Sequence, residues 1–177
     1  MKFPQKKLKN VHSYFQEYSK TLNQVLKKLD LKELSNFTDT IEEAILMQKN
    51  IFVCGNGGSA AIANHLVCDY IKLMRKNTNL KPKVISLSTS IELITAISND
   101  FSYDKIFSEQ LDYLAQKDDL LILISSSGNS KNIINAVKFC KKNKIKTVGL
   151  SGFNGGYLAK NADISLHLQC ENYGISE

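Results

Sequence analysis

The sequence predicts an α/β fold, a three-layer α/β/α sandwich around a five-stranded parallel sheet, with helices ahead of the first strand. Five short apolar segments alternate with segments of helical periodicity. This alternation is typical of a parallel sheet that helices cover on both faces. A chain of 177 residues has the length of one ordinary domain and can bury roughly two-thirds of its unfolded surface. We therefore expect a single domain over residues 1–177, which includes an N-terminal helical segment, residues 1–48.

The periodicity places the elements along the chain. Apolar residues recur at helical spacing over residues 11–29 and again over 34–45, which predicts two amphipathic helices. Ligands of parallel α/β sheets bind beyond the carboxyl ends of the strands, so we expect the binding site in the loops that follow the strands. The predicted strands are residues 51–54, 84–87, 120–124, 147–150 and 164–168, with helices at 60–73, 104–116 and 131–142.

Composition and charge argue against several classes of function. The net charge of +6 comes mostly from lysines without the interleaved aromatic residues of a nucleic-acid platform, so we predict no nucleic-acid partner. The four cysteines form no CxxC pair, which is typical of free thiols in a reducing compartment. We expect Cys54 and Cys68 to be buried, and His167 to have a structural role in the last strand. No apolar stretch has signal-peptide or membrane-spanning length, which predicts a cytoplasmic protein without a membrane partner.

Two predicted strand ends carry loops suited to a phosphate. The first strand is followed by GNGGSAA, residues 55–61, where glycines let the backbone approach a ligand and Ser59 can cap the next helix. The N-terminus of that helix would present free amides to an anion. The third strand is followed by SSSGNS, residues 125–130, with four hydroxyls and an amide. Tight turns also favour these residue types, but two such loops on one sheet favour a phosphate-ester site.

A dinucleotide site is the competing interpretation of the first loop. Gly55, Gly57 and Ala60 match the GxGxxG/A fingerprint. That fingerprint also requires an acidic residue at the end of the second strand to bind the ribose. The second strand ends in SLST, residues 86–89, and Glu92 falls in the following helix. The missing acid and the unexplained serine loop therefore count against NAD, and the absence of GxxxxGK[ST] counts against a P-loop.

The helix after the first loop places His65 and Asp69 four residues apart on one face. This spacing suits two ligands of one metal, or a base with the group that orients it. A His–Asp pair without chemistry is the alternative, and the neighbouring phosphate-type loop favours the chemical role. Farther along, Asn99 and Asp100 end the helix after the second strand, where they either bind sugar hydroxyls or turn the chain.

Taken together, these motifs resemble bacterial phosphoheptose isomerases of the sugar isomerase (SIS) superfamily. GNGGSAA, the downstream His65, TAISNDFSYDKIFSEQL, LISSSGNS and VGLSGFNGG carry the resemblance. It implies the SIS fold and a homotetramer that converts sedoheptulose 7-phosphate into D-glycero-D-manno-heptose 7-phosphate through an enediol, for surface-polysaccharide heptose. A non-catalytic sugar-phosphate sensor, or a partner of the replication initiator protein, is the alternative. That partner lacks an acidic residue at the position of Asp69, so this carboxylate favours catalysis.

The resemblance also implies roles for individual residues, with one zinc ion per subunit. His65, Asp69 and Glu177 would be zinc ligands, and His65 and Asp69 the catalytic pair. Asp69 stands where the family usually has a glutamate, which sets its carboxylate about 1 Å farther back, a displacement that can cost ~10²-fold in rate. Glu177 aligns with a glutamine that precedes a further His of the family, so we expect the chain to continue past Glu177. The implied substrate contacts are Asn56, Gly57, Gly58, Ser59, Asp69, Asn99, Asp100, Ser125, Ser126, Ser127, Ser130 and Glu177.

Overall fold

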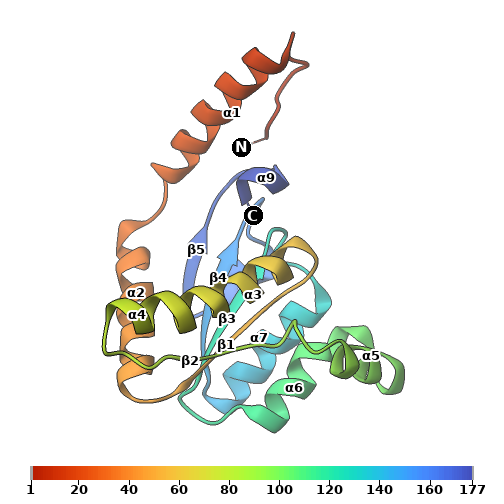
Figure 1. The fold of residues 1–177 in the computed structure, drawn as a ribbon. Helices are drawn as coiled ribbons and strands as arrows, with labels where there is room; N and C mark the ends of the chain where they lie inside the picture. Colours follow the sequence, from red (N-terminus) through yellow and green to blue (C-terminus); the bar gives the residue numbers. More distant parts are fainter. Residues whose placement is uncertain (1, 177) are drawn as a thin grey trace.

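All five apolar segments form strands of one parallel sheet in the computed structural model, which describes residues 2–176 (Figure 1). The strand order is β2-β1-β3-β4-β5. The predicted α/β/α sandwich with a five-stranded parallel sheet is confirmed. The strands are β1 (Asn50–Gly55), β2 (Lys83–Ser86), β3 (Leu120–Ser125), β4 (Lys146–Ser151) and β5 (Ile164–His167).

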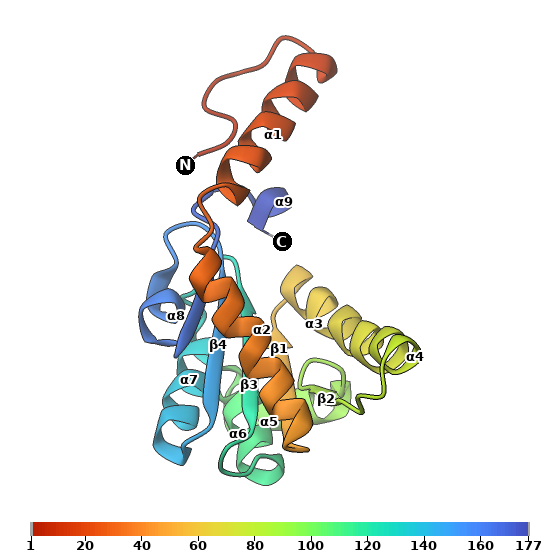
Figure 2. The same cartoon turned by 90° about the vertical axis from the view of Figure 1, so that its left-hand side faces the viewer.

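Helices cover both faces of the sheet, and α2 crosses the strands in Figure 2. One face packs against α2 (Leu31–Leu46) and α3 (Gly58–Asp69). The other face packs against α6 (Ile106–Leu114), α7 (Lys131–Asn143) and α8 (Gly156–Asn161). The helix predicted over residues 60–73 is longer in the structure, because a π-helical turn follows α3 and extends it. The remaining elements are α1 (Val11–Leu26), η1 (Tyr70–Met74), α4 (Arg75–Asn77), α5 (Ile91–Asp100), η2 (Tyr103–Lys105) and α9 (Tyr173–Ser176).

Strands β1 and β3, inside the sheet, are buried on both faces. Phe52 and Leu123 face the layer of α6 and α7, whereas Ile51 and Ile122 face α2 and α3. Side chains alternate between the faces with period 2, so a strand covered on both sides reads as a continuous apolar run. The edge strand β2 differs, because Ile85 is 37% exposed where the apolar sequence predicts burial.

Helix α1 extends beyond the sheet (Figure 1). Only Thr21 and Val25 of this helix are buried, whereas Val11 and Phe15 are 84% and 66% exposed. A small cluster of Phe3, Val25, Cys170 and Ile175 joins the helix to the end of the described chain. The amphipathic pattern thus predicts the helix correctly, but residues 2–176 cover only part of its apolar face.

The four cysteines, all within the described residues, are free thiols. Cys54 is buried as predicted, and burial raises the pKa of its thiol well above the ordinary value, so it is not a thiolate nucleophile. The prediction that Cys68 is buried is wrong. Ala63 and Val67 form the sheet-facing stripe of α3, and the next residue along a helix points about 100° away, so Cys68 faces solvent.

Between residues 2 and 176, no helix is long and apolar enough to span a bilayer.

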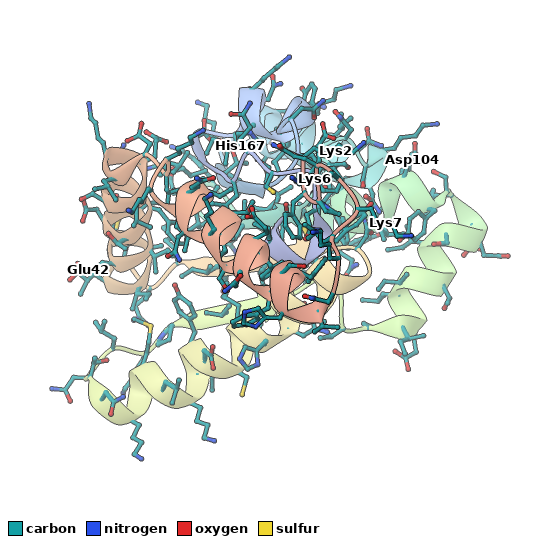
Figure 3. The ribbon with its side chains drawn as sticks, turned by 90° about the horizontal axis from the view of Figure 1, so that it is seen from above. Lys2, Lys6, Lys7, Glu42, Asp104 and His167 are labelled. Carbon is teal, nitrogen blue, oxygen red and sulfur yellow. The ribbon has the colours of Figure 1, made fainter. Side chains whose placement is uncertain are left out.

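Ser151 and His167 join the carboxyl ends of β4 and β5. They are register partners, and Ser151 Oγ and His167 Nδ1 share a hydrogen bond of 3.1 Å (His167 is labelled in Figure 3). Burial is the largest cause that lowers the pKa of His167 below its ordinary value, because the buried imidazolium loses hydration. The structural role predicted for His167 agrees with this geometry.

We predict that His167 makes the protein less stable in mild acid. The unfolded chain takes up the proton near pH 6.5 and the folded chain at lower pH, so the free energy of unfolding should fall as pH drops below about 6.5. Urea titrations between pH 5 and pH 8 would measure this slope in the wild type and in His167→Asn. The variant should have a shallower slope below pH 6.5 and a constant offset above pH 7.5. Identical slopes would contradict the prediction.

Candidate functional site

The loops after β1 and β3 meet at the carboxyl edge of the sheet, because Gly55 pairs with Ile124 where the two strands end. A pocket of about 120 Å³ opens between them, which we call the serine pocket. The structure brings six of the residues selected from the sequence together here, together with Ile124 and Tyr173 from α9. Those six are Asn56, Ser59, Ser125, Ser126, Ser127 and Ser130.

The glycine loop turns directly into α3. Gly57 has a φ of +56° and is the N-cap, without a side-chain cap hydrogen bond. The expectation that Ser59 caps this helix is therefore wrong, because the helix already begins at Gly58. Ser59 lies in the first turn, is buried, and lines the serine pocket.

The serine loop holds its hydroxyls at the N-terminus of α7. Ser125 and Ser126 are buried, and Ser125 Oγ accepts a hydrogen bond of 3.2 Å from the backbone N–H of Gly128. Ser130 is the N-cap of α7, and its side chain makes no cap hydrogen bond. The first amides of a helix have no partner within the helix and carry partial positive charge. Hydroxyls and helix amides thus converge where an anion would be stabilised.

A larger pocket of about 640 Å³ adjoins the serine pocket and shares Asn56 and Ser130 with it. We call it the outer pocket. Its other lining residues are Tyr103, Asp104, Lys131 and Asn132, none of which the sequence reasoning selected. Lys131 and Asn132 directly follow SSSGNS, and Tyr103 and Asp104 lie within the SNDFSYDKIF segment. Their position beside these two motifs was the signal in the sequence that could have identified them as pocket residues.

The outer pocket carries charges of both signs. Asp104 lies in η2, beside α7, and is labelled in Figure 3. A hydrogen bond from the Ser102 hydroxyl is the largest cause that lowers the pKa of Asp104, and attraction to Lys131 adds to it. The Asp104 carboxylate is thus ionised at neutral pH. An ionised carboxylate, an ammonium and amides suit a ligand rich in hydroxyl groups.

His65 and Asp69 lie together on α3, outside both pockets. His65 Nε2 and Asp69 Oδ2 are 3.4 Å apart, and the two side chains are 76% and 46% exposed. They can serve as two donors to one metal. Residues 2–176 of one chain hold no group of three His, Cys, Asp or Glu side chains arranged for a metal ion. The third ligand expected from the sequence, Glu177, lies outside the described residues.

Asn99 and Asp100 end α5 on the surface. Asn99 Nδ2 donates a hydrogen bond of 2.9 Å to Asp100 Oδ1. Neither residue lines the serine pocket or the outer pocket, and the same is true of Gly57 and Gly58. The folded chain therefore brings the serines and Asn56 together and leaves Asn99 and Asp100 apart from them.

We predict that the serine loop tolerates no side chain at Gly128. Gly57 and Gly128 both have positive φ, but a Cβ at Gly128 would lie 2.0 Å from the Gly155 carbonyl oxygen, whereas a Cβ at Gly57 would meet nothing within 4 Å. Gly57→Ala should lower the free energy of unfolding by about 1–2 kcal/mol, and Gly128→Ala by about 2–5 kcal/mol. Urea denaturation measures both. Equal losses would show that the serine loop does not pack against Gly155 as described.

Comparison with known proteins places these features in a family context. Residues 13–152 match the family model of the SIS domain. The chain is 35% identical over 156 residues to a phosphoheptose isomerase of Campylobacter concisus, covering 88% of this chain and 81% of that protein. It is 40% identical over 154 residues to one from Sulfurimonas denitrificans, covering 81% and 78%. The structure of phosphoheptose isomerase GmhA from Neisseria gonorrhoeae is similar with a TM-score of 0.83 and 30% identity, covering 94% of this chain and 88% of that one.

Proposed function

Since this chain belongs to the SIS domain family and, within it, to the phosphoheptose isomerases, we propose that it is an aldose–ketose isomerase for a phosphorylated seven-carbon sugar. The reaction converts sedoheptulose 7-phosphate into D-glycero-D-manno-heptose 7-phosphate, as an early step toward surface-polysaccharide heptose. The observation that carries the proposal is the serine pocket, where two loops far apart in sequence supply hydroxyls and helix amides to one small cavity.

The serine pocket holds the phosphate group. Ser125, Ser126, Ser127 and Ser130 offer hydroxyl donors, and the N-terminus of α7 adds backbone amides and its dipole. Lys131 opens the same helix and adds a positive charge. The adjoining outer pocket, lined with polar side chains, receives the hydroxylated carbon chain. This arrangement binds a phosphate ester with neutral hydroxyl and amide donors, and the charge of Lys131 adds to them.

The isomerisation moves a proton between neighbouring carbon atoms. A base removes a proton from the hydroxyl-bearing carbon beside the carbonyl while the carbonyl oxygen takes up a proton, which gives an enediol. A proton then returns to the former carbonyl carbon while the neighbouring hydroxyl loses its proton, so the atoms balance without an oxidant. We assign the base to Asp69, with His65 at 3.4 Å to orient it and exchange protons. The substrate contacts implied for Gly57, Gly58, Asn99 and Asp100 remain part of the proposal.

Assembly is a second part of the proposal. The exposed His65–Asp69 pair needs cover to exclude water, and exposed apolar side chains stand on α1 and α5, among them Phe15 and Ile91, which are 66% and 71% exposed. Patches of this kind mark protein–protein contacts, which supports a homotetramer.

The four free thiols are in keeping with a reducing, cytoplasmic location, which is also part of the proposal.

Zinc is a third part of the proposal. Two donors, His65 Nε2 and Asp69 Oδ2, fit one edge of a tetrahedral zinc site, with Glu177 as the further donor outside the described residues. A zinc ion held there would polarise the substrate carbonyl. Residues 2–176 of one chain do not complete such a site, and the acid–base assignment above is made from the geometry of the His65–Asp69 pair.

We predict that Asp69→Asn abolishes isomerisation while changing substrate affinity little, because it removes charge and basicity but keeps the shape. Formation of the aldose from sedoheptulose 7-phosphate would be followed in the wild type and variant, each with added zinc and with chelator. Asp39→Asn, an exposed position on α2, is the matched control and should keep wild-type activity. Full activity of Asp69→Asn would eliminate the assigned base. A wild type that binds the sugar phosphate but never turns it over would instead favour a sensor.

We predict that Ser127→Ala raises KM and leaves the fold intact. Ser127 is half-buried in the serine pocket, and a hydrogen bond from a hydroxyl to an anion contributes about 1.5–3 kcal/mol, which corresponds to roughly tenfold or more in KM. Ser165→Ala on β5 is the control, because its Oγ is buried without a hydrogen-bond partner among the described residues, and its KM should not change. If Ser127→Ala unfolds the protein, the serine loop is structural and the phosphate assignment falls.

A further inference from the structure

A pair of asparagines joins the two loops of the site. Asn56 Nδ2 donates to Asn132 Oδ1 at 2.9 Å, and Asn132 Nδ2 donates back to Asn56 Oδ1 at 2.9 Å. Asn56 follows β1, whereas Asn132 lies in the first turn of α7. This reciprocal amide pair therefore links the glycine loop to the helix that carries the serine loop.

The hydrogen bonds around the pair allow only one orientation of each amide. The backbone N–H of Ile133 donates to Asn132 Oδ1 at 2.9 Å, and a backbone N–H can only donate, so this atom must be the amide oxygen. Asn56 must then turn its Nδ2 toward that oxygen and its Oδ1 toward Asn132 Nδ2. The Tyr103 hydroxyl donates to the same Asn56 Oδ1 at 3.0 Å.

Burial makes this pair rigid. Asn132 is 2% exposed, and buried amide hydrogen bonds are costly to break, because a group left without its partner loses its hydration as well. Asn56, by contrast, is half-buried and lines both the serine pocket and the outer pocket. An asparagine amide has two N–H donors, so Asn56 can hold Asn132 with one and present the other to a substrate oxygen.

We propose that Asn132 and Tyr103 are positioning residues that hold the Asn56 amide in the orientation needed for the sugar part of the substrate. This inference rests on the proposed function for its substrate, and on the three hydrogen bonds at Asn56 for its geometry. Asn132 borders the outer pocket, but it is only 2% exposed, so its role is to hold Asn56. Tyr103 adds a second restraint from η2 and also lines the outer pocket.

A double-mutant cycle tests the proposal in the full chain. Asn132→Ala and Asn56→Ala should each lower kcat/KM by about 10- to 100-fold, as expected when a binding group is displaced. The double variant should be no worse than Asn56→Ala alone, because Asn132 then has nothing to position. If the losses of the two single variants instead multiply in the double variant, the proposal is overturned.

Tyr103→Phe keeps the ring and should lower kcat/KM by about 3- to 10-fold. Unchanged kinetics in this variant would exclude a positioning role for the Tyr103 hydroxyl. The control is Asn143→Ala on the same helix as Asn132, where the exposed side-chain amide donates to Phe139 O, and it should behave as wild type.

A second measurement does not depend on isomerase activity. In ¹⁵N-labelled protein, the side-chain amide signal of Asn56, assigned by its loss in Asn56→Ala, should exchange slowly with solvent. In Asn132→Ala, exchange should be at least about tenfold faster, because the bonded N–H is released. Unchanged exchange would overturn the positioning role even if the enzyme works as proposed. Faster exchange in a protein that does not isomerise sedoheptulose 7-phosphate would support the positioning role and reject only the substrate.

Discussion

The parallel pairing of β1 with β3 is the constraint on which the site depends. Both strands are buried on both faces, so their register is held by the two apolar layers as well as by the backbone ladder. With Gly55 opposite Ile124, the loops that follow must leave the sheet side by side. The serine pocket, the outer pocket and the Asn56–Asn132 pair all lie at this one edge. A slip of one residue would turn Ser125 to the opposite face and separate the two loops.

Binding and chemistry are built differently in this chain. The phosphate-type pocket is assembled within one chain from buried hydroxyls and a helix N-terminus, so its donors are held before a ligand arrives. The His65–Asp69 pair stands on the exposed side of α3, where water weakens the interaction between the two side chains. Proton transfer from carbon favours a site closed to water, and in the assembly proposed above a second copy would supply that closure by packing on the exposed apolar residues of α1 and α5.

Much of the fold follows from local pattern, and the exceptions have physical causes. The central strands are predicted well because burial on both faces leaves an apolar run in the sequence. Ile85 and Cys68 were expected to be buried, but one lies on an edge strand and the other beside the inward stripe of its helix. Ser59 was expected to cap α3, which begins two residues earlier than that role requires. Tyr103 and Asn132 were not selected, because their roles depend on contacts with Asn56 from distant parts of the chain.

The sequence by itself determined the class of fold, the two phosphate-type loops and the pairing of His65 with Asp69, because each is written in residues close together along the chain. Only the tertiary structure decided that both loops open into one pocket and that the His65–Asp69 pair is exposed in a single chain. It alone showed that Asn132 hydrogen-bonds to Asn56 through both of its amide atoms. Hydrogen bonds between residues 76 positions apart follow from strand register and helix packing, and neither composition nor local spacing encodes them.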